Sequence, residues 1–227
     1  MAPGGVNGDG LTDLDGEEAL AVEIDRRIRA LPDRTVGSIR GVRLEYSRRL
    51  RSALAEQVVG LALALVGRQR WVAYELLYHH PGALECLDAH RIERLGQGMD
   101  SWVAVDTFGC DVAGPAWRKR RMPDAVVHRW AVSEDRWWRR AALVSTVPLN
   151  LRSRGGTGDT QRTLDVCRRL IADRDDMVVK ALSWALRALV VQDPEAVRRF
   201  LEAHGDALAP RVRREVRNKL ETGLKNP

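Results

Sequence analysis

The sequence predicts an all-α fold, because apolar residues recur at spacings of three and four along most of its length, not at two. Pro, Gly and Asp at the breaks between these segments are typical of helix starts and ends. Related helical segments return at intervals of roughly 35 to 45 residues, the period of HEAT or armadillo helix pairs. We therefore expect an all-α, HEAT-like helical-repeat solenoid with a concave basic groove. A globular helical bundle is the alternative architecture.

The first half of the chain begins with a segment rich in Gly and Asp, residues 1–16, which has no periodicity. It predicts a disordered tail in front of a single repeat domain over residues 17–227. Helices are expected wherever apolar residues recur at spacings of three and four, and His80-Pro81-Gly82 marks one break between two helices. The predicted helical ranges are 17–30, 42–55, 57–66, 71–79 and 83–95.

The second half of the chain also consists of predicted helices separated by short breaks, with a proline or an acidic residue at several helix starts. The clearest breaks are Arg121-Met122-Pro123-Asp124, Ser133-Glu134-Asp135 and Gln192-Asp193-Pro194-Glu195. The predicted helical ranges are 101–112, 124–131, 135–147, 160–172, 177–191, 195–203 and 210–222.

Length and composition exclude several classes of protein. A chain of 227 residues, 44% hydrophobic and 30% charged, can bury a core without disulfide or metal staples and is not wholly disordered. The mean hydropathy is -0.31, and the longest uncharged apolar run, Val58 to Gly67, is too short to cross a bilayer. The N-terminus lacks the pattern of a secretory signal, so we expect a cytoplasmic protein.

The charge balance favours a phosphate-rich partner. Net charge is +6 and the pI is about 9.7. Of 37 basic residues, four are lysine and the rest are arginine. Codon usage in a GC-rich genome is an alternative source of the arginine excess, but it does not explain the positive sum.

Cysteine and histidine give no sign of a metal site or a disulfide framework. The three cysteines are scattered and form no CxxC pair, and the five histidines form no HExxH motif or zinc-finger spacing. We therefore expect no zinc site and no disulfide framework.

Seven tryptophans against two phenylalanines make tryptophan placement informative. On the helix predicted over 177–191, Trp184 lies opposite an arc of leucines and valine, between Lys180 at i−4 and Arg187 at i+3. This placement favours a role toward a ligand. The alternative is a tryptophan buried against a neighbouring helix, with its cationic neighbours extending past it to solvent.

Two further helices carry polar residues of interest. In 101–112, Trp102 and Asp106 are four residues apart and share the face opposite Val105 and Phe108. Taken alone, Asp106 fits a solvated acid or the partner of an arginine at least as well. In 135–147, Arg140 has apolar neighbours, so it should be either paired in a salt bridge or held toward a ligand.

Three segments together resemble a known family. They are MDSWVAVDTFG (99–109), SEDRWWRRAALV (133–144) and VVKALSWALRALVVQDPEAVRRFL (178–201). Their W-x-x-x-D, W-x-x-R-x-A and K-A-x-x-W-x-L-R patterns are similar to those of the AlkD-like DNA alkylpurine glycosylases, bacterial repair enzymes built from HEAT-like repeats. The likeness runs from about residue 71 to 220 and fades toward the N-terminus.

The resemblance implies a monofunctional glycosylase that hydrolyses the N-glycosidic bond of cationic N3- or N7-alkylated purines in duplex DNA, without enclosing the base in a pocket. It implies Asp106 as the catalytic carboxylate, Trp102 and Trp184 as groove tryptophans, and Arg140 as a phosphate-directed arginine. Further DNA-binding candidates are Lys180, Arg187, Arg139, Arg136 and Arg43. It also implies no metal and no cofactor, because hydrolysis of an already activated bond needs neither. The protein is expected to be a monomer, associated with the nucleoid when bound to DNA.

Two positions depart from the family pattern, and two other functions stay open. Ser101 stands where relatives often carry a second aromatic residue, and Arg43-Leu44 replaces a polar pair in the early helix. The position of the lesion and the DNA register are therefore expected to differ from those of relatives. The alternatives are a non-catalytic helical-repeat protein that binds nucleic acid, and a protein-binding scaffold.

Overall fold

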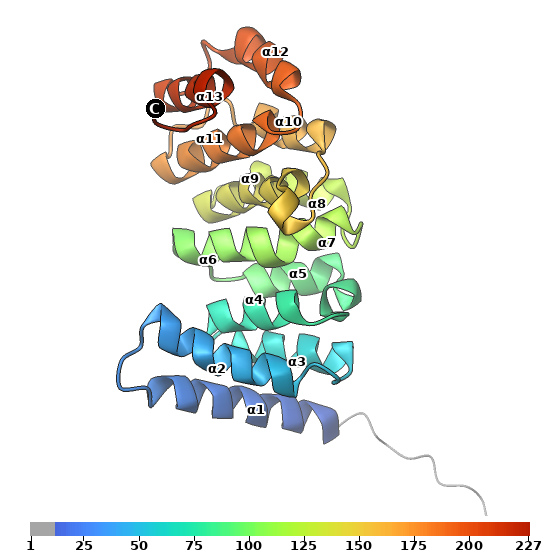
Figure 1. Ribbon diagram of the computed structural model, residues 1–227. Helices are drawn as coiled ribbons and strands as arrows, with labels where there is room; N and C mark the ends of the chain where they lie inside the picture. Colours follow the sequence, from blue (N-terminus) through green and yellow to red (C-terminus); the bar gives the residue numbers. More distant parts are fainter. Residues whose placement is uncertain (1–11) are drawn as a thin grey trace, which may run out of the picture. The chain divides into compact units, whose positions relative to one another are not determined.

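The computed structural model describes residues 12–227, which are helical and contain no strand (Figure 1). This confirms the all-α prediction, and the successive packed helices fit a helical-repeat solenoid. The chain divides into two compact units, one ending at Cys86 and one beginning at Leu87. Within the described residues, no helix has the length and apolar character needed to cross a membrane. A single domain over 17–227 stays a prediction.

The first unit pairs its helices around a small apolar core. Its elements are α1 (Thr12–Arg29), α2 (Val36–Arg49), α3 (Ala55–Leu65), α4 (Arg70–His79) and the short 3-10 helix η1 (Ala83–Cys86). Helix α1 packs against α3, and α2 packs against α4. Ile24, Ile28, Leu61, Leu65 and Tyr74 are fully buried in this core.

Two helix starts in this unit differ from the prediction. Helix α1 begins at Thr12, inside the predicted tail, and residues 1–11 of that tail lie outside the described residues. Helix α2 begins at Val36, because the Thr35 side chain accepts a hydrogen bond from the Ser38 backbone N–H and caps the helix. Apolar periodicity alone missed this start, because the first buried residue of α2 is Val42.

The second unit contains the three segments that carry the family resemblance. Its elements are α5 (Ala89–Gly96), α6 (Trp102–Thr107), the π-helix η2 (Phe108–Ala113), α7 (Gly114–Arg118), α8 (Asp124–Ala131), α9 (Arg136–Asn150), η3 (Arg152–Arg154), α10 (Thr160–Arg169), α11 (Asp176–Val190), α12 (Pro194–His204) and α13 (Pro210–Thr222).

Helices of this unit pack as successive pairs, as Figure 1 shows. Helix α8 packs against α9, α10 against α11, and α12 against α13. The second members of the pairs also form a row, in which α9 contacts α11 and α11 contacts α13. At the other side of α9 lie α6 and η2. This row places the helices of Asp106, Arg140 and Trp184 next to one another in that order.

Two predicted helical ranges of this unit, 83–95 and 101–112, differ most from the structure, and others are shifted by one to three residues. The range 83–95 is interrupted, because Asp88 caps a new helix by accepting a hydrogen bond from the Arg91 backbone N–H. The range 101–112 instead continues to Arg118 through the π-helix, without a break. The predicted bounds 124–131 and 210–222 agree with α8 and α13.

Candidate active site

Helix α6 presents two of the predicted residues on one exposed face. Ser101 caps the helix by accepting a hydrogen bond from the Ala104 backbone N–H. Trp102, the first helical residue, is 55% exposed, and Asp106 lies one turn later on the same side. The opposite side is buried through Val105 and Phe108. The predicted division of this helix into a buried apolar face and an opposite face with Trp102 and Asp106 is therefore present.

Helix α9 approaches the continuation of α6 very closely at two glycines. A Cβ on Gly109 would lie 2.7 Å from Val144 Cγ1, and a Cβ on Gly114 would lie 2.6 Å from the Ser145 carbonyl oxygen. Because both partners lie in the buried part of α9, a side chain at either glycine would push the two helices apart. Both glycines come soon after Asp106 in the sequence, so this close packing holds Asp106 opposite α9.

Asp106 and Arg140 form a bidentate ion pair across this interface. Arg140 Nε donates to Oδ1 and Nη2 donates to Oδ2, each at 2.8 Å. Arg140 is 5% exposed, and its Nη1 donates to the backbone carbonyl of Met177 in the first turn of α11. The guanidinium thus joins α6, α9 and α11 in one contact. Of the two environments expected for Arg140, the structure shows the paired one.

The carboxylate of Asp106 experiences two opposing influences. Burial raises the pKa of Asp106 above its ordinary value, because a low-dielectric surrounding disfavours the charged form, while Arg140 lowers it through hydrogen bonding and charge. The side chain is still 19% exposed. Each carboxylate oxygen bonded to Arg140 retains acceptor capacity for a second partner.

Helix α11 carries Trp184 on the side away from its buried arc. Val178, Leu182, Leu186 and Leu189 are buried, as predicted, while Trp184 is half-buried. Met177, Lys180, Trp184 and Arg187 follow one another at spacings of three and four and form one stripe of partly exposed residues. Trp184 therefore lies on the same stripe as Met177, about 10 Å further along the helix axis.

The two cations beside Trp184 differ in their surroundings. Lys180 is partly exposed, and its Nζ lies 2.6 Å from Asp176 at the exposed start of α11. Arg187 is more buried; its Nε donates to Ser183 Oγ at 3.1 Å and lies 3.9 Å from Glu215 Oε2. Burial lowers the pKa of Arg187. Lys180 is therefore more accessible to a phosphate than Arg187.

The two arginines at the start of α9 are also engaged. Arg139 Nε donates to Asp173 at 2.8 Å, and its Nη1 donates to the backbone carbonyls of Ser133 and Glu134, so this side chain ties two loops together. Arg136 is exposed, 3.6 Å from Asp175, with its guanidinium 4.8 Å from the Trp137 ring centroid. Arg136 is thus the more accessible of the two.

Arg43 lies in the first unit and is not placed as its predicted role requires. The side chain is buried, and Nε donates to Glu75 Oε2 at 2.6 Å, with Ser47 as a second partner of the guanidinium. An arginine that neutralises a buried carboxylate is not available to a DNA phosphate. We therefore leave Arg43 out of the proposed DNA contacts.

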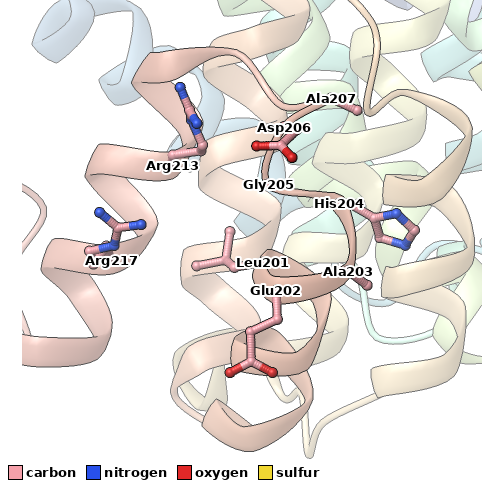
Figure 2. Close-up of a pocket in the computed structure, with 9 residues that line it drawn as sticks. All are labelled: Leu201, Glu202, Ala203, His204, Gly205, Asp206, Ala207, Arg213 and Arg217. Carbon is pink, nitrogen blue, oxygen red and sulfur yellow. The ribbon is translucent and has the colours of Figure 1, made fainter.

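A pocket of about 360 Å³ lies away from these residues, between α12 and α13 (Figure 2). Arg213 and Arg217 line it on α13, and Glu202 and Asp206 line it on the other side. It contains none of the predicted site residues. The described residues also include no group of three His, Cys, Asp or Glu side chains placed to hold a metal ion.

Two features of the site have only weak signals in the sequence. The Met177 carbonyl as a partner of Arg140 depends on the packing of α9 against α11, which no local pattern reveals. The π-helix after Asp106 does leave a trace, since Gly109, Gly114 and Pro115 interrupt an otherwise helical period.

Comparison with known proteins gives one family. A family model described as DNA alkylation repair enzyme matches residues 40–220 of the chain. This range covers all the predicted site residues in both units. Comparison with curated proteins gives no significant match. Comparison with solved structures gives none either.

Proposed function

The chain belongs to the family of DNA alkylation repair enzymes, and we propose that it is a monofunctional DNA glycosylase. Its substrates in this proposal are cationic N3- or N7-alkylated purines in duplex DNA. The bidentate pair of Asp106 with Arg140 is the observation that carries the proposal, because it holds a carboxylate in a fixed orientation at a partly exposed surface beside an exposed tryptophan.

The chemistry of the substrate explains why so few groups are needed. Alkylation at N3 or N7 makes the purine positively charged. When the bond between its nitrogen and C1′ of deoxyribose breaks, the bonding electron pair stays with the purine, which leaves as a neutral base. No proton has to be donated to the leaving group. The positive charge that develops on the sugar is what the protein has to stabilise.

Asp106 is proposed to stabilise that charge. A fixed carboxylate near C1′ attracts the oxocarbenium-like sugar and accepts a hydrogen bond from the attacking water. The water oxygen bonds to C1′ and its proton passes to the carboxylate or to solvent. Arg140 acts as a positioning residue in this scheme, because it orients both oxygens and favours their charged form against burial.

Trp102 and Trp184 are proposed to hold the sugar and the cationic lesion. Trp102 is exposed and precedes Asp106 by one helical turn, and Trp184 lies on the helix whose first turn bonds Arg140. A cation over the face of an indole gains about 0.5 to 2 kcal/mol. Because Trp102 and Asp106 lie on the outer face of α6, hydrolysis in this scheme needs contact with the sugar and not enclosure of the base.

The exposed cations near the site are proposed to hold the DNA strand. Lys180 and Arg136 are the most accessible of the predicted set, and their acidic partners Asp176 and Asp175 are themselves at helix starts. Contacts of this kind position the duplex without reading its sequence. Arg187 and Arg139 would contribute mainly by supporting α11 and the loops beside it.

Release of free base from defined substrates tests the proposal. The full chain is incubated with duplexes that contain 7-methylguanine or 3-methyladenine, and the released base is measured under single turnover for the wild type and for Asp106→Asn. We expect release by the wild type and a loss of roughly 10²- to 10³-fold in the variant, the usual cost of removing one preorganised electrostatic group.

Asp100→Asn is the matched control, because Asp100 is an exposed carboxylate on the loop before α6. It should leave the rate unchanged. Undiminished release by Asp106→Asn would remove this residue from the mechanism. Binding of duplex DNA without release from either substrate would favour the non-catalytic binding protein, and the absence of both would favour a protein scaffold.

A further inference from the structure

Two loops of the second unit form a basic surface that the proposed chemistry does not use. One loop, residues 118–121, ends α7, and the other, residues 152–154, ends α9. Together they contain no acidic residue. Their cations, which we call the basic edge, are Arg118, Lys119, Arg120, Arg121, Arg152 and Arg154.

Two of these arginines fasten the loops to each other. Arg118 Nη1 donates to the backbone carbonyls of Pro148 and Arg154, and Arg154 Nη1 donates to the Asp111 carboxylate and the Cys110 carbonyl. These contacts bring the ends of α7 and α9 side by side. The cations of the two loops therefore lie next to one another and form one surface.

The other four cations are exposed to solvent. These are Lys119, Arg120, Arg121 and Arg152. Arg120 and Arg152 have no acidic partner among the described residues. Asp111 and Asp124, the acids nearest to the loop 118–121 in sequence, already pair with Arg154 and Arg162. The charges of Arg120 and Arg152 are therefore not neutralised by a carboxylate within the described part of the chain.

Arg120 has an unfavourable backbone conformation. Its φ is +57°, the left-handed region, where the described residues otherwise place only glycines. A residue with a Cβ is strained there, and Gly or Asn would suit the turn better. Conformational strain of this sort concentrates at functional positions.

The basic edge lies at the far end of the helix that carries Asp106. Helices α6, η2 and α7 form one continuous helical segment from Trp102 to Arg118. At a rise of 1.5 Å per residue, Asp106 and Arg118 are at most about 18 Å apart along its axis. This span is comparable with the width of a B-form duplex, so one bound duplex can reach both ends of the segment.

We propose that the basic edge binds backbone phosphates of the same duplex, away from the lesion. This inference rests on the proposed function, since it takes DNA as the ligand. Arg120 and Arg152 supply the contacts to phosphate, Lys119 and Arg121 add to the local potential, and Arg118 and Arg154 keep the two loops together. The contacts are independent of sequence and of damage, because phosphate is present at every nucleotide.

Binding of undamaged duplex DNA by the full chain tests the proposal. Because this DNA contains no lesion, the test is independent of base release. The test variant is the double substitution Arg120→Gln and Arg152→Gln. The matched control is Arg94→Gln with Arg199→Gln, which removes the same charge from exposed positions on α5 and α12. Dissociation constants are measured at several salt concentrations.

The test variant should bind about tenfold or more weakly near 0.1 M salt, and the slope of log K against log salt should fall by about 1 for each lost phosphate contact. The control should keep the wild-type slope. Equal affinity and slope in the test and control variants would overturn the proposal, whatever the outcome of the release experiment.

A single substitution separates loss of binding from loss of folding. Arg120→Gly removes the charge and relieves the positive φ. Its melting temperature should be at least that of the wild type, while its affinity for duplex DNA falls and its salt slope decreases by about 1. A variant that binds DNA as the wild type does would show that Arg120 has no contact with phosphate.

Discussion

At the scale of single residues, the proposed mechanism depends on one carboxylate and on the arginine that holds it. The positions of Asp106 and Arg140 on their helices predict a functional role for both, but they are equally consistent with a structural salt bridge for each. The structure shows that the two alternatives are the same contact, since each residue is the partner of the other. A salt bridge and a catalytic role are compatible here, because Arg140 occupies only part of the acceptor capacity of the carboxylate.

The pH dependence of base release tests the role of Arg140 as a positioning residue. Burial raises the pKa of Asp106 and Arg140 opposes that effect. In the proposed mechanism the ionised carboxylate is the active form, so the single-turnover rate should fall as pH decreases through this pKa. Arg140→Gln removes the opposing charge, so the acidic limb should move to higher pH. Arg140→Lys should restore part of the shift but not the bidentate geometry, and an acidic limb at the wild-type position in Arg140→Gln would contradict this role.

Trp102 allows activity and stability to be separated. Its side chain is 55% exposed, so Trp102→Ala removes little buried surface and should change the melting temperature only slightly. The same change should lower kcat/KM by the equivalent of about 0.5 to 2 kcal/mol, the range of a cation–π contact. Melting curves and single-turnover rates on one preparation make the comparison. Normal activity would exclude Trp102 from the site.

At the scale of helices, the sequence was sufficient for most elements and for which face of each is buried. The opposed faces of α6 and α11 follow directly from a helical period, because that period is a local property. The start of α2 was missed because a capping threonine precedes its first buried residue by several positions. The Met177 contact and the burial of Arg43 with Glu75 depend on packing between helices, which a single sequence does not display.

The π-helical turn makes a prediction about how Asp106 is positioned. Gly109→Ala would place a Cβ 2.7 Å from Val144 Cγ1, within the buried part of α9. We expect a loss of about 1 to 3 kcal/mol in the free energy of unfolding, from overpacking. The rate of base release should fall with it, because the Asp106 carboxylate moves relative to Arg140.

Gly41→Ala is the matched control in this experiment. Gly41 lies within α2, and a Cβ there would meet no atom within 4 Å. This substitution should stabilise the protein by about 0.4 to 1 kcal/mol, the usual gain for alanine at an unstrained helical position. If Gly109→Ala had wild-type stability and activity, the close approach of η2 to α9 would have no part in holding the site.

At the scale of the whole molecule, the arginine excess divides into different roles. Arg43, Arg139, Arg140 and Arg154 are held by carboxylates and carbonyls of the protein, whereas Arg120 and Arg152 are exposed and have no acidic partner among the described residues. Net charge alone favoured DNA as a partner but did not distinguish these roles. Buried pairs of this kind are sensitive to the loss of either partner, because the other charge is then left uncompensated.

Arg43 tests the distinction between arginines held in ion pairs of the protein and arginines available to DNA. Arg43→Gln should destabilise the protein by about 3 to 5 kcal/mol, since Glu75 would remain buried without its closest partner. The affinity of the folded variant for duplex DNA, measured well below its melting temperature, should match that of the wild type. Chemical denaturation and DNA binding under the same conditions provide the two readouts. Weaker DNA binding at unchanged stability would return Arg43 to the set of DNA contacts.

The central claim is that the Asp106 carboxylate faces the sugar at which positive charge develops. The most direct measurement compares the affinity for two duplexes, one with a cationic azasugar and one with a neutral tetrahydrofuran at the lesion position. The wild type and Asp100→Asn should prefer the cationic sugar by about tenfold or more, a difference of about 1.4 kcal/mol, and Asp106→Asn should lose that preference. An equal preference in all three proteins would contradict the claim.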